Sequence, residues 1–225
     1  LYSRQKNIGF IKTVNSALLK CPTRYALILN SDVVLGDYWL DNMVATAESD
    51  ERIATVNPLT NRASQIEIAI PPGVNFLEVN RYLQNHPQKP IDVVTGVGFC
   101  MLLRMKALQE IGFLDEIYGA GYCEESDLCM RLTTNGWRTV VAPNVYVYHK
   151  GAGSFTEKRE RYLQNRRIFD ARWKAEYTAQ FIQFKKKNPL RHVRAVLTPP
   201  QRWTPIAHAR QTYRLMRDAI REVKI

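Results

Sequence analysis

The sequence predicts an α/β domain with a mostly parallel sheet flanked by helices, followed by a basic helical extension. Short apolar runs typical of buried strands alternate with helical patterns over residues 1–155. Turn residues such as Asn135-Gly136 separate these runs. All of the excess positive charge falls in residues 156–225, whose pattern is mainly helical. We therefore divide the chain into a body, residues 1–155, and an extension, residues 156–225.

The expected strands are short apolar runs, each closed by residues that favour turns. They are residues 25–30, 53–56, 91–94, 96–103, 139–141 and 145–148. The expected helices each have an apolar face and cover residues 37–48, 75–84, 105–111 and 124–135. Asn57-Pro58 predicts the end of the second strand. Because ligands sit beyond the carboxyl ends of parallel strands, Asn30-Ser31-Asp32 and Thr95-Gly96 are expected beside a cleft.

The composition, 45% hydrophobic in 225 residues, is enough for one domain with a sizeable core and an appendage. No run approaches the roughly 20 apolar residues of a membrane-spanning helix. The four cysteines lack the spacing of a zinc knuckle, so we expect free thiols in a reducing cytosol. The body holds 14 Lys+Arg against 15 Asp+Glu, and the extension holds 18 against 6. This asymmetry predicts a basic arm that meets an anionic surface.

Asp32 follows a buried strand and is preceded by Asn30 and Ser31. An acid in this position faces the ligand crevice, and hard cations such as Mg²⁺ or Mn²⁺ prefer carboxylate, water and phosphate oxygens. The alternative is a turn that ends the strand, for which Asn-Ser-Asp is well suited. These residues alone leave both interpretations open.

Three acids, Glu124, Glu125 and Asp127, fall in the first turn of the expected helix 124–135. One interpretation is structural, because the helix dipole and the free amides at a helix N-terminus favour negative side chains. The other is catalytic, with one carboxylate accepting the proton of an attacking hydroxyl group. Asp127 and Arg131 are also spaced for an i,i+4 ion pair, which favours a structural role for Asp127.

His149 follows the apolar run 145–148 and leads into a glycine-containing loop. A histidine at such a strand end can serve as a neutral metal ligand. The alternative is a surface histidine that only makes hydrogen bonds.

Seven motifs follow one another between residues 5 and 155. They are Asn7-Ile-Gly-Phe10 with Asn15, Ala26-Leu-Ile-Leu-Asn-Ser-Asp-Val33, Gly96-Val-Gly-Phe-Cys-Met-Leu-Leu-Arg104, Ile111-Gly-Phe-Leu-Asp-Glu116, Glu124-Glu-Ser-Asp-Leu-Cys-Met-Arg131, Gly136-Trp137 and Val147-Tyr-His149. This series resembles the inverting family-2 glycosyltransferases of the GT-A fold. It is most similar to the rhamnosyltransferase-type bacterial members that build cell-surface polysaccharides.

The resemblance implies roles for individual residues. Asp32 corresponds to the metal-binding acid that ends the family's Asp-x-Asp motif, with Asn30 in place of the first acid, and His149 to the histidine near the metal and diphosphate. Glu124 and Glu125 match the family's Glu-Asp motif, which makes Glu125 the expected catalytic base, one methylene longer than the usual aspartate. The implied donor-binding residues are Asn7, Gly9, Asn30, Ser31 and Gly96. The implied acceptor-binding residues are Asp115, Asp127 and Trp137.

The implied reaction is sugar transfer, with inversion, from a nucleotide-diphosphate donor such as a UDP- or dTDP-sugar to a glycan or lipid-linked acceptor. A divalent cation, Mn²⁺ or Mg²⁺, is the implied cofactor. The family opens with strands that hold the nucleotide base, whereas residue 1 already aligns with the family's third strand. We therefore expect the native protein to be longer at its N-terminus, or another segment to supply those strands. The alternative is an inactive GT-A-like module that binds glycans or assembles complexes.

The extension mixes basic residues with aromatic residues, namely Phe155, Tyr162, Phe169, Trp173, Tyr177, Phe181 and Phe184. Such helices suit anionic membrane surfaces, which predicts a cytoplasmic protein attached peripherally to the inner face of the plasma membrane. The alternative is a helix that packs its aromatic residues on the body and leaves its charges in solvent. Breaks are expected near Asn188-Pro189 and Pro199-Pro200, with a last helix over 206–223. No nucleic-acid-binding motif accompanies the basic charge, so no nucleic-acid partner is expected.

Overall fold

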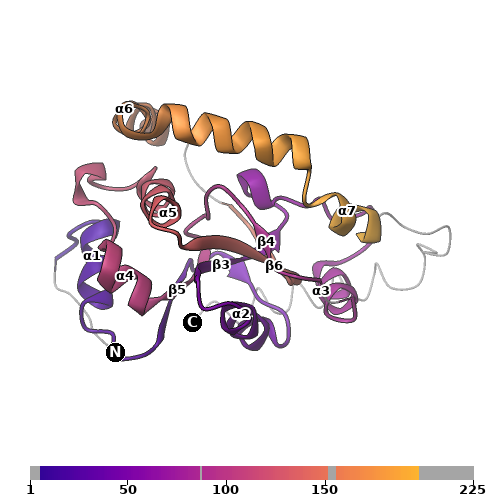
Figure 1. Cartoon of the computed structure of the whole chain (residues 1–225). Helices are drawn as coiled ribbons and strands as arrows, with labels where there is room; N and C mark the ends of the chain where they lie inside the picture. Colours follow the sequence, from indigo (N-terminus) through magenta and orange to yellow (C-terminus); the bar gives the residue numbers. More distant parts are fainter. Residues whose placement is uncertain (1–5, 87, 152–155, 198–225) are drawn as a thin grey trace.

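The computed structural model describes residues 6–86, 88–151 and 156–197. The described part forms a six-stranded sheet with helices on both faces (Figure 1). In chain order the elements are α1 (Phe10–Leu18), β1 (Tyr25–Leu29), β2 (Val33–Val34), α2 (Trp39–Glu48), β3 (Ile53–Thr60), η1 (Ser64–Ile66), α3 (Phe76–Gln84), β4 (Ile91–Asp92), β5 (Cys100–Arg104), α4 (Met105–Ile111), η2 (Glu116–Tyr118), α5 (Glu124–Thr134), β6 (Arg138–His149), α6 (Thr156–Lys187) and α7 (Arg191–Leu197).

The sheet is mixed rather than mostly parallel, which corrects the prediction from sequence. Its strand order is β1-β5-β3-β6-β2, with β4 also paired to β6, and only β3 and β6 pair in parallel. The reason is that β5 inserts between β1 and β3 and runs against both. As a result the start of β5, at Cys100, lies opposite the end of β1, at Leu29. Gly96 therefore approaches the edge of the sheet where β1 ends. It does so before the first residue of an antiparallel strand, not after the last residue of a parallel one.

Alternating residues of the sheet face two apolar cores. In β5, Cys100 and Leu102 belong to one core and Met101 and Leu103 to the other. Helices α2 and α3 cover the first face, and α4, α5 and α6 cover the second (Figure 1). The prediction of an α/β fold with helices flanking a sheet is confirmed.

Two predicted breaks do not occur where the sequence suggested. Strand β3 continues through Asn57-Pro58 to Thr60. Its pairing with β5 stops at Val56, so Pro58 lies where only β6 still pairs with β3 and its missing N–H is tolerated. The runs 139–141 and 145–148 are one strand, β6, with a register shift opposite Pro58 and Leu59.

Helix α6 packs on the body through its aromatic residues. Phe169 is buried in the second core, and Trp173 and Tyr177 pack against that core. The expected end at Asn188 is observed, because α6 stops at Lys187 and Asn188 has a φ of 43°. For the described residues, the packing alternative is thus the one observed. Phe155, the break at Pro199-Pro200 and the predicted helix 206–223 lie outside the described residues.

Within the described residues, no helix has both the length and the apolar character to cross a membrane. The four cysteines, Cys21, Cys100, Cys123 and Cys129, are free thiols, as expected from their spacing.

Candidate active site

Asp32 and His149 lie together at the edge where β1 and β6 end. Strand β2 follows Asp32 at once and pairs with the last residues of β6, so that Val33 is opposite His149. The backbone of Lys150 also donates a hydrogen bond to the Asp32 carbonyl oxygen, 3.0 Å away. This pairing brings His149 Nε2 to 3.4 Å from Asp32 Oδ2. The two predicted metal ligands, 117 residues apart in sequence, are therefore neighbours.

Three neighbours fix the orientation of His149. Its backbone N–H donates to Asn61 Oδ1 at 2.8 Å, and Asn61 Nδ2 donates back to the His149 carbonyl oxygen at 3.1 Å. Its ring stacks on Phe99, with the centroids 4.8 Å apart. Its Nδ1 lies 3.2 Å from the carbonyl oxygen of Arg62, which can only accept a hydrogen bond. Nδ1 therefore carries a proton in this contact, and a metal would be bound through Nε2, the ring atom that faces Asp32.

This arrangement fits a divalent cation. His149 Nε2 and Asp32 Oδ2 face each other at 3.4 Å, so that both could bind one cation. Two ligands at right angles around one cation, each about 2.1 Å from it, lie about 3 Å apart. No group of three or more His, Cys, Asp or Glu side chains that could hold a metal occurs in the part of the chain that the structure describes. Asp32 and His149 would therefore supply two ligands, and phosphate or water oxygens the others.

The dipeptide Gly98-Phe99 connects this pair to the acidic end of α5. The Gly98 amide donates a hydrogen bond to Glu125 Oε1 at 3.1 Å. The next residue, Phe99, stacks on His149, and its carbonyl oxygen accepts a 2.8 Å hydrogen bond from the Asn30 amide. Two consecutive residues thus touch the predicted base on one side and the predicted metal pair on the other. The structure brings Asn30, Asp32, His149 and Glu125 into one site.

Glu124 and Glu125 form an acidic pair with unusual protonation. Glu124 is 3% exposed, and one of its carboxylate oxygens, Oε2, has no hydrogen-bond partner. Burial, together with the nearby charge of Glu125, raises the pKa of Glu124 to about 8. Burial also raises the pKa of Glu125, although hydrogen bonds from backbone amides and from Glu124 oppose the rise. The raised pKa favours the protonated form of Glu124 near neutral pH, which can donate a hydrogen bond toward Glu125.

The predicted donor-binding residues have different settings. Asn30 and Ser31 are exposed beside the Asp32–His149 pair. Asn7 is also exposed, and its side chain accepts a hydrogen bond from the Gly9 amide in the turn that begins α1. Gly96 is buried, and a methyl group there would overlap the Asn57 side chain. Packing alone therefore accounts for the glycine at position 96.

Two predicted acceptor-binding acids, Asp127 and Asp115, make intramolecular hydrogen bonds and ion pairs. Asp127 is fully buried and accepts hydrogen bonds from Tyr118, Arg131, Arg172 and Trp173. The i,i+4 pair with Arg131 is present at 2.8 Å, which favours the structural alternative. Asp115 binds the Ile117 amide at 2.9 Å and Arg172 at 2.7 Å. Burial raises the pKa of Asp115, but these two hydrogen bonds outweigh it and leave the pKa below its ordinary value.

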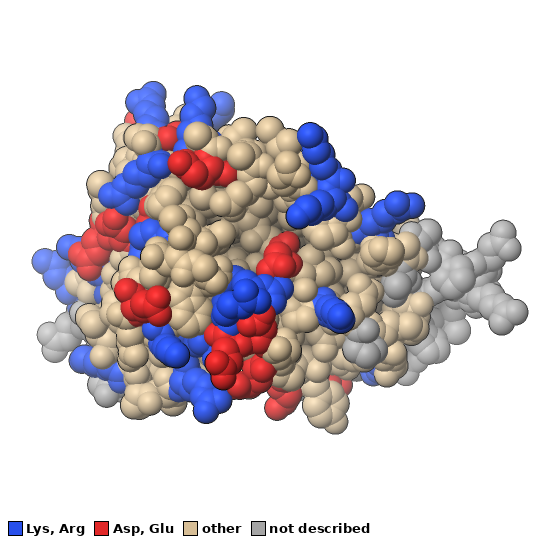
Figure 2. All heavy atoms as spheres, in the orientation of Figure 1, with Lys and Arg blue, Asp and Glu red and all other residues tan. Residues whose placement is uncertain are grey.

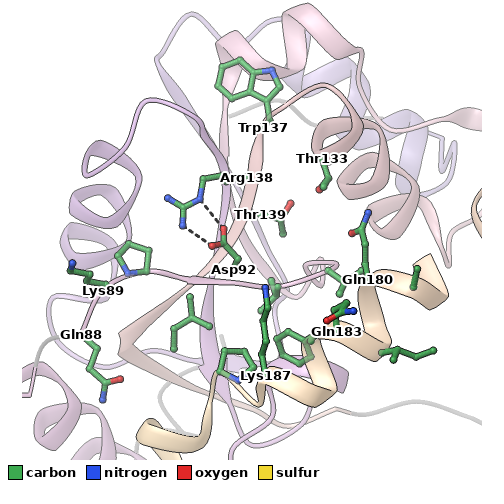
Figure 3. A pocket seen from close by; sticks show the side chains of 18 of the residues that line it. Gln88, Lys89, Asp92, Thr133, Trp137, Arg138, Thr139, Gln180, Gln183 and Lys187 are labelled. Atoms are coloured by element: carbon green, nitrogen blue, oxygen red, sulfur yellow. Dashed lines mark hydrogen bonds and ion pairs between the residues drawn. The ribbon is translucent and has the colours of Figure 1, made fainter. Parts of the chain in front are cut away.

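Trp137, the third predicted acceptor-binding residue, is not brought to this site. It follows α5, whereas Glu125 is at the start of that helix, and 11 residues of helix span about 16 Å. Trp137 also lies at the opposite end of β6 from His149. It lines a separate cavity, which Figure 3 shows from close by. This cavity has a volume of about 910 Å³ and lies between α5, β4, the start of β6 and the second half of α6. An ion pair between Arg138 and Asp92 lies in the wall of this cavity (Figure 3).

Sequence reasoning missed several residues of the site. Gly98 is one of them, since a methyl group there would lie 2.7 Å from Glu125 Oε1. Asn57, in β3, donates hydrogen bonds to the carbonyl oxygens of Val97 and Cys100 and so fixes the shape of this segment. The Gly-x-Gly spacing was the available signal for Gly98. Nothing local marks Asn57, whose role depends on a strand pairing.

Proteins with an open α/β sheet form a class that commonly binds ligands beyond the carboxyl ends of the strands, where Asp32 and His149 lie. Within this class, the chain belongs to glycosyl transferase family group 2, whose family model matches residues 75–214. A second model, glycosyl transferase family 2, matches residues 1–112. The first match crosses the boundary at residue 155 that the charge pattern predicts. No curated protein matches the chain.

Solved structures share the fold. GalNAc-T7, crystallised with UDP, GalNAc and Mn²⁺, superposes with a TM-score of 0.55 at 14% identity over 87% of this chain. The mannosyltransferase PcManGT from Pyrobaculum calidifontis, in complex with GDP-Man and Mn²⁺, gives a TM-score of 0.50 at 15% identity over 96% of this chain. The chain spans 41% and 56% of these two proteins. The expected GT-A fold is confirmed.

Proposed function

We propose that this chain carries the catalytic site of a metal-dependent glycosyltransferase that moves a sugar from a nucleotide-diphosphate donor to a hydroxyl group of an acceptor, with inversion. The observation that supports it most strongly is the Gly98-Phe99 contact. It joins a carboxylate fit to be a base with a carboxylate–histidine pair fit for a cation. Membership of glycosyl transferase family group 2 supports the same reaction.

Glu125 acts as the general base in this proposal. As the acceptor oxygen attacks the anomeric carbon, its proton moves to Glu125, the new carbon–oxygen bond forms, and the bond to the diphosphate breaks with its electron pair on the diphosphate. The Gly98 amide holds one oxygen of Glu125, and protonated Glu124 donates to the carboxylate. Both hydrogen bonds oppose the rise in the pKa of Glu125 that burial causes, and they orient its carboxylate.

Asp32 and His149 would hold the cation, with Asn30 and Ser31 beside it on the donor side. A bound divalent cation supplies charge that stabilises the departing diphosphate. Because Asn30 replaces an acid, the site carries one negative charge fewer, which lowers its affinity for the metal more than it changes its chemistry. The requirement for Mn²⁺ or Mg²⁺ is part of the proposal.

The donor in this proposal is a nucleotide sugar. The two solved structures support this class, since they hold UDP with GalNAc and GDP-Man. The motifs favour a UDP- or dTDP-hexose, with rhamnose as one case, and a glycan or lipid-linked saccharide acceptor of cell-surface polysaccharide synthesis.

A lipid-linked acceptor would require the enzyme to work at a membrane, in the cytoplasm against the inner face of the plasma membrane. The outward side of α6 supports this placement with exposed basic side chains, namely Arg159, Arg161, Arg167, Lys174, Lys185, Lys186 and Lys187. Lys and Arg side chains project along the side of the molecule that α6 forms (Figure 2). Since the buried aromatic residues of α6 pack on the body, attachment would depend mainly on charge. Sedimentation with phosphatidylglycerol vesicles that is lost in 0.5 M salt, and absent with phosphatidylcholine, tests it; equal sedimentation with both contradicts it.

A transfer assay tests the proposed function. The full-length protein is incubated with a panel of UDP-, dTDP- and GDP-sugars, with Mn²⁺ or with excess chelator, and the anomer formed is read by proton NMR. The expected result is metal-dependent hydrolysis or transfer of one donor, with inversion. Full activity in excess chelator would exclude the role given to Asp32 and His149. Glycan binding without turnover of any donor would instead favour an inactive module.

A further inference from the structure

The loop before α5 has a backbone that its own sequence does not stabilise. Between η2 and α5, Gly119, Gly121, Tyr122 and Cys123 all have positive φ values. The left-handed region is unfavourable for residues with a Cβ atom, and two such residues, Tyr122 and Cys123, follow one another here. Cys123 is the N-cap of α5 and makes no side-chain capping hydrogen bond. Contacts from elsewhere must hold this loop.

Asn165 of α6 provides those contacts. Its side chain is 6% exposed, and its Nδ2 donates to three carbonyl oxygens of the loop. They belong to Tyr118 at 2.7 Å, Gly121 at 2.7 Å and Tyr122 at 3.1 Å. A side-chain amide has only two N–H groups, so all of its donor capacity is directed at this loop.

The loop leads directly into the acidic pair. Glu124 and Glu125 are the first two residues of α5, immediately after Cys123. The loop also packs on Glu124, since a methyl group at Gly121 would lie 3.5 Å from Glu124 Oε1. Any shift of the loop therefore shifts the start of α5 and both carboxylates with it.

Helix α6 is anchored to α5 at a second place, at Asp127. Two turns beyond Asn165, the Trp173 indole donates to Asp127 at 2.8 Å, and Arg172 reaches the same carboxylate at 3.3 Å. The second anchor holds α6 on the body through contacts that do not involve Asn165, and Asp127 also accepts a hydrogen bond from the Tyr118 hydroxyl group at the start of the loop. The Asn165 contacts are therefore not the only ones that hold α6 on the body, and their main effect is on the conformation of the loop.

We propose that Asn165 is a positioning residue that acts through the loop 118–122 to hold Glu125 in place for proton transfer. Helix α6 then belongs to the catalytic apparatus, although the charge pattern separates it from the body. The kinetic part of this inference rests on the proposed function, whereas the structural part does not.

The test compares Asn165→Ala with Gln164→Ala, a neighbouring exposed position on the same helix. Amide hydrogen exchange over residues 119–125 should become at least about 10-fold faster in Asn165→Ala only. NMR titration of carboxyl-labelled glutamate should show the pKa of Glu125 falling toward its ordinary value, because a loosened loop admits water. In the transfer assay, kcat should fall roughly 10- to 100-fold with the donor KM nearly unchanged, and the acidic limb of the kcat profile should move to lower pH.

Unchanged exchange and an unchanged pKa of Glu125 in folded Asn165→Ala would overturn the inference whether or not any sugar is transferred. Faster exchange with unchanged kcat in an active enzyme would also overturn it, since Asn165 would then serve only the loop. If Asn165→Ala does not fold, Asn165→Ser, which keeps one donor, is measured in the same way. If neither variant folds, Asn165 is a folding residue and the inference is wrong. A wild-type protein that turns over no donor would refute the proposed function alone.

Discussion

Glu124→Gln removes a buried carboxyl group whose pKa is raised to about 8, without changing the size of the side chain. In the folded chain the pKa of Glu124 is raised from 4.5 to about 8, first by burial and then by the charge of Glu125. In the unfolded chain the same group titrates at its ordinary value. Glutamine keeps the hydrogen-bond donor toward Glu125 but cannot lose a proton. The substitution therefore removes one of the two coupled titrations of this pair.

The sign and size of the effect on the free energy of unfolding follow from the linkage between proton binding and folding. A carboxyl whose pKa is raised on folding stabilises the folded state fully below pH 4.5, and that stability is lost as the pH rises to about 8. The difference between 4.5 and about 8 corresponds to on the order of 5 kcal/mol. The free energy of unfolding of the wild type should fall by an amount of this order, relative to Glu124→Gln, between pH 5 and pH 8.

Urea unfolding followed by circular dichroism at pH 5, 6, 7 and 8 measures this difference. Glu116→Gln, at an exposed position, is the matched control and should follow the wild type. In the transfer assay the loss of activity above pH 8 should disappear in Glu124→Gln, because its donor to Glu125 persists. Parallel stability curves for wild type and Glu124→Gln would show that Glu124 is not protonated in the folded chain.

Two other substitutions test the contacts of the acidic helix. Gly98→Ala places a methyl group 2.7 Å from Glu125 Oε1, so kcat should fall about 10- to 100-fold. The melting temperature should stay near that of the wild type. Transfer kinetics equal to those of the wild type would show that Gly98 does not hold the base. Trp173→Phe removes a donor to the buried carboxylate of Asp127 and should lower the free energy of unfolding by about 1–3 kcal/mol in urea titrations. Lys174→Ala, next to it and exposed, should change it by less than about 0.5 kcal/mol, and an equal effect of both would contradict the role of Trp173.

The parts of the fold that the sequence predicted are those governed by local pattern. The run at 25–30 contains β1, and the run at 96–103 contains β5 except for its last residue, Arg104. The helices predicted at 105–111 and 124–135 are α4 and α5 with near-identical ends. Helix α1 was not predicted, although Ile11 and Leu18 lie on its buried side with helical spacing. Local pattern could not reveal that β5 inserts between β1 and β3, because strand partners are chosen by long-range packing.

The residues of the site show the same distinction between what local pattern predicts and what long-range packing determines. Asp32 and His149 could be predicted singly from strand ends and from the family motifs, but their contact depends on the pairing of β2 with β6. Asp127 shows the opposite case, since its spacing to Arg131 already indicated the ion pair that is observed. Asn165 could not be identified from sequence, because it donates hydrogen bonds to three carbonyl groups more than 40 residues away.

Measuring donor binding and sugar transfer separately tests most directly whether the Asp32–His149 pair and Glu125 form one active site. Mn²⁺-dependent binding of UDP and of the preferred donor is measured by calorimetry on the full-length wild type, Glu125→Gln and Asp32→Asn, alongside transfer. Glu125→Gln should bind within about 3-fold of the wild type and lose at least about 100-fold in kcat, whereas Asp32→Asn should lose Mn²⁺-dependent binding. Normal transfer by Glu125→Gln would contradict the assignment of the base and, with it, the site built around Gly98-Phe99.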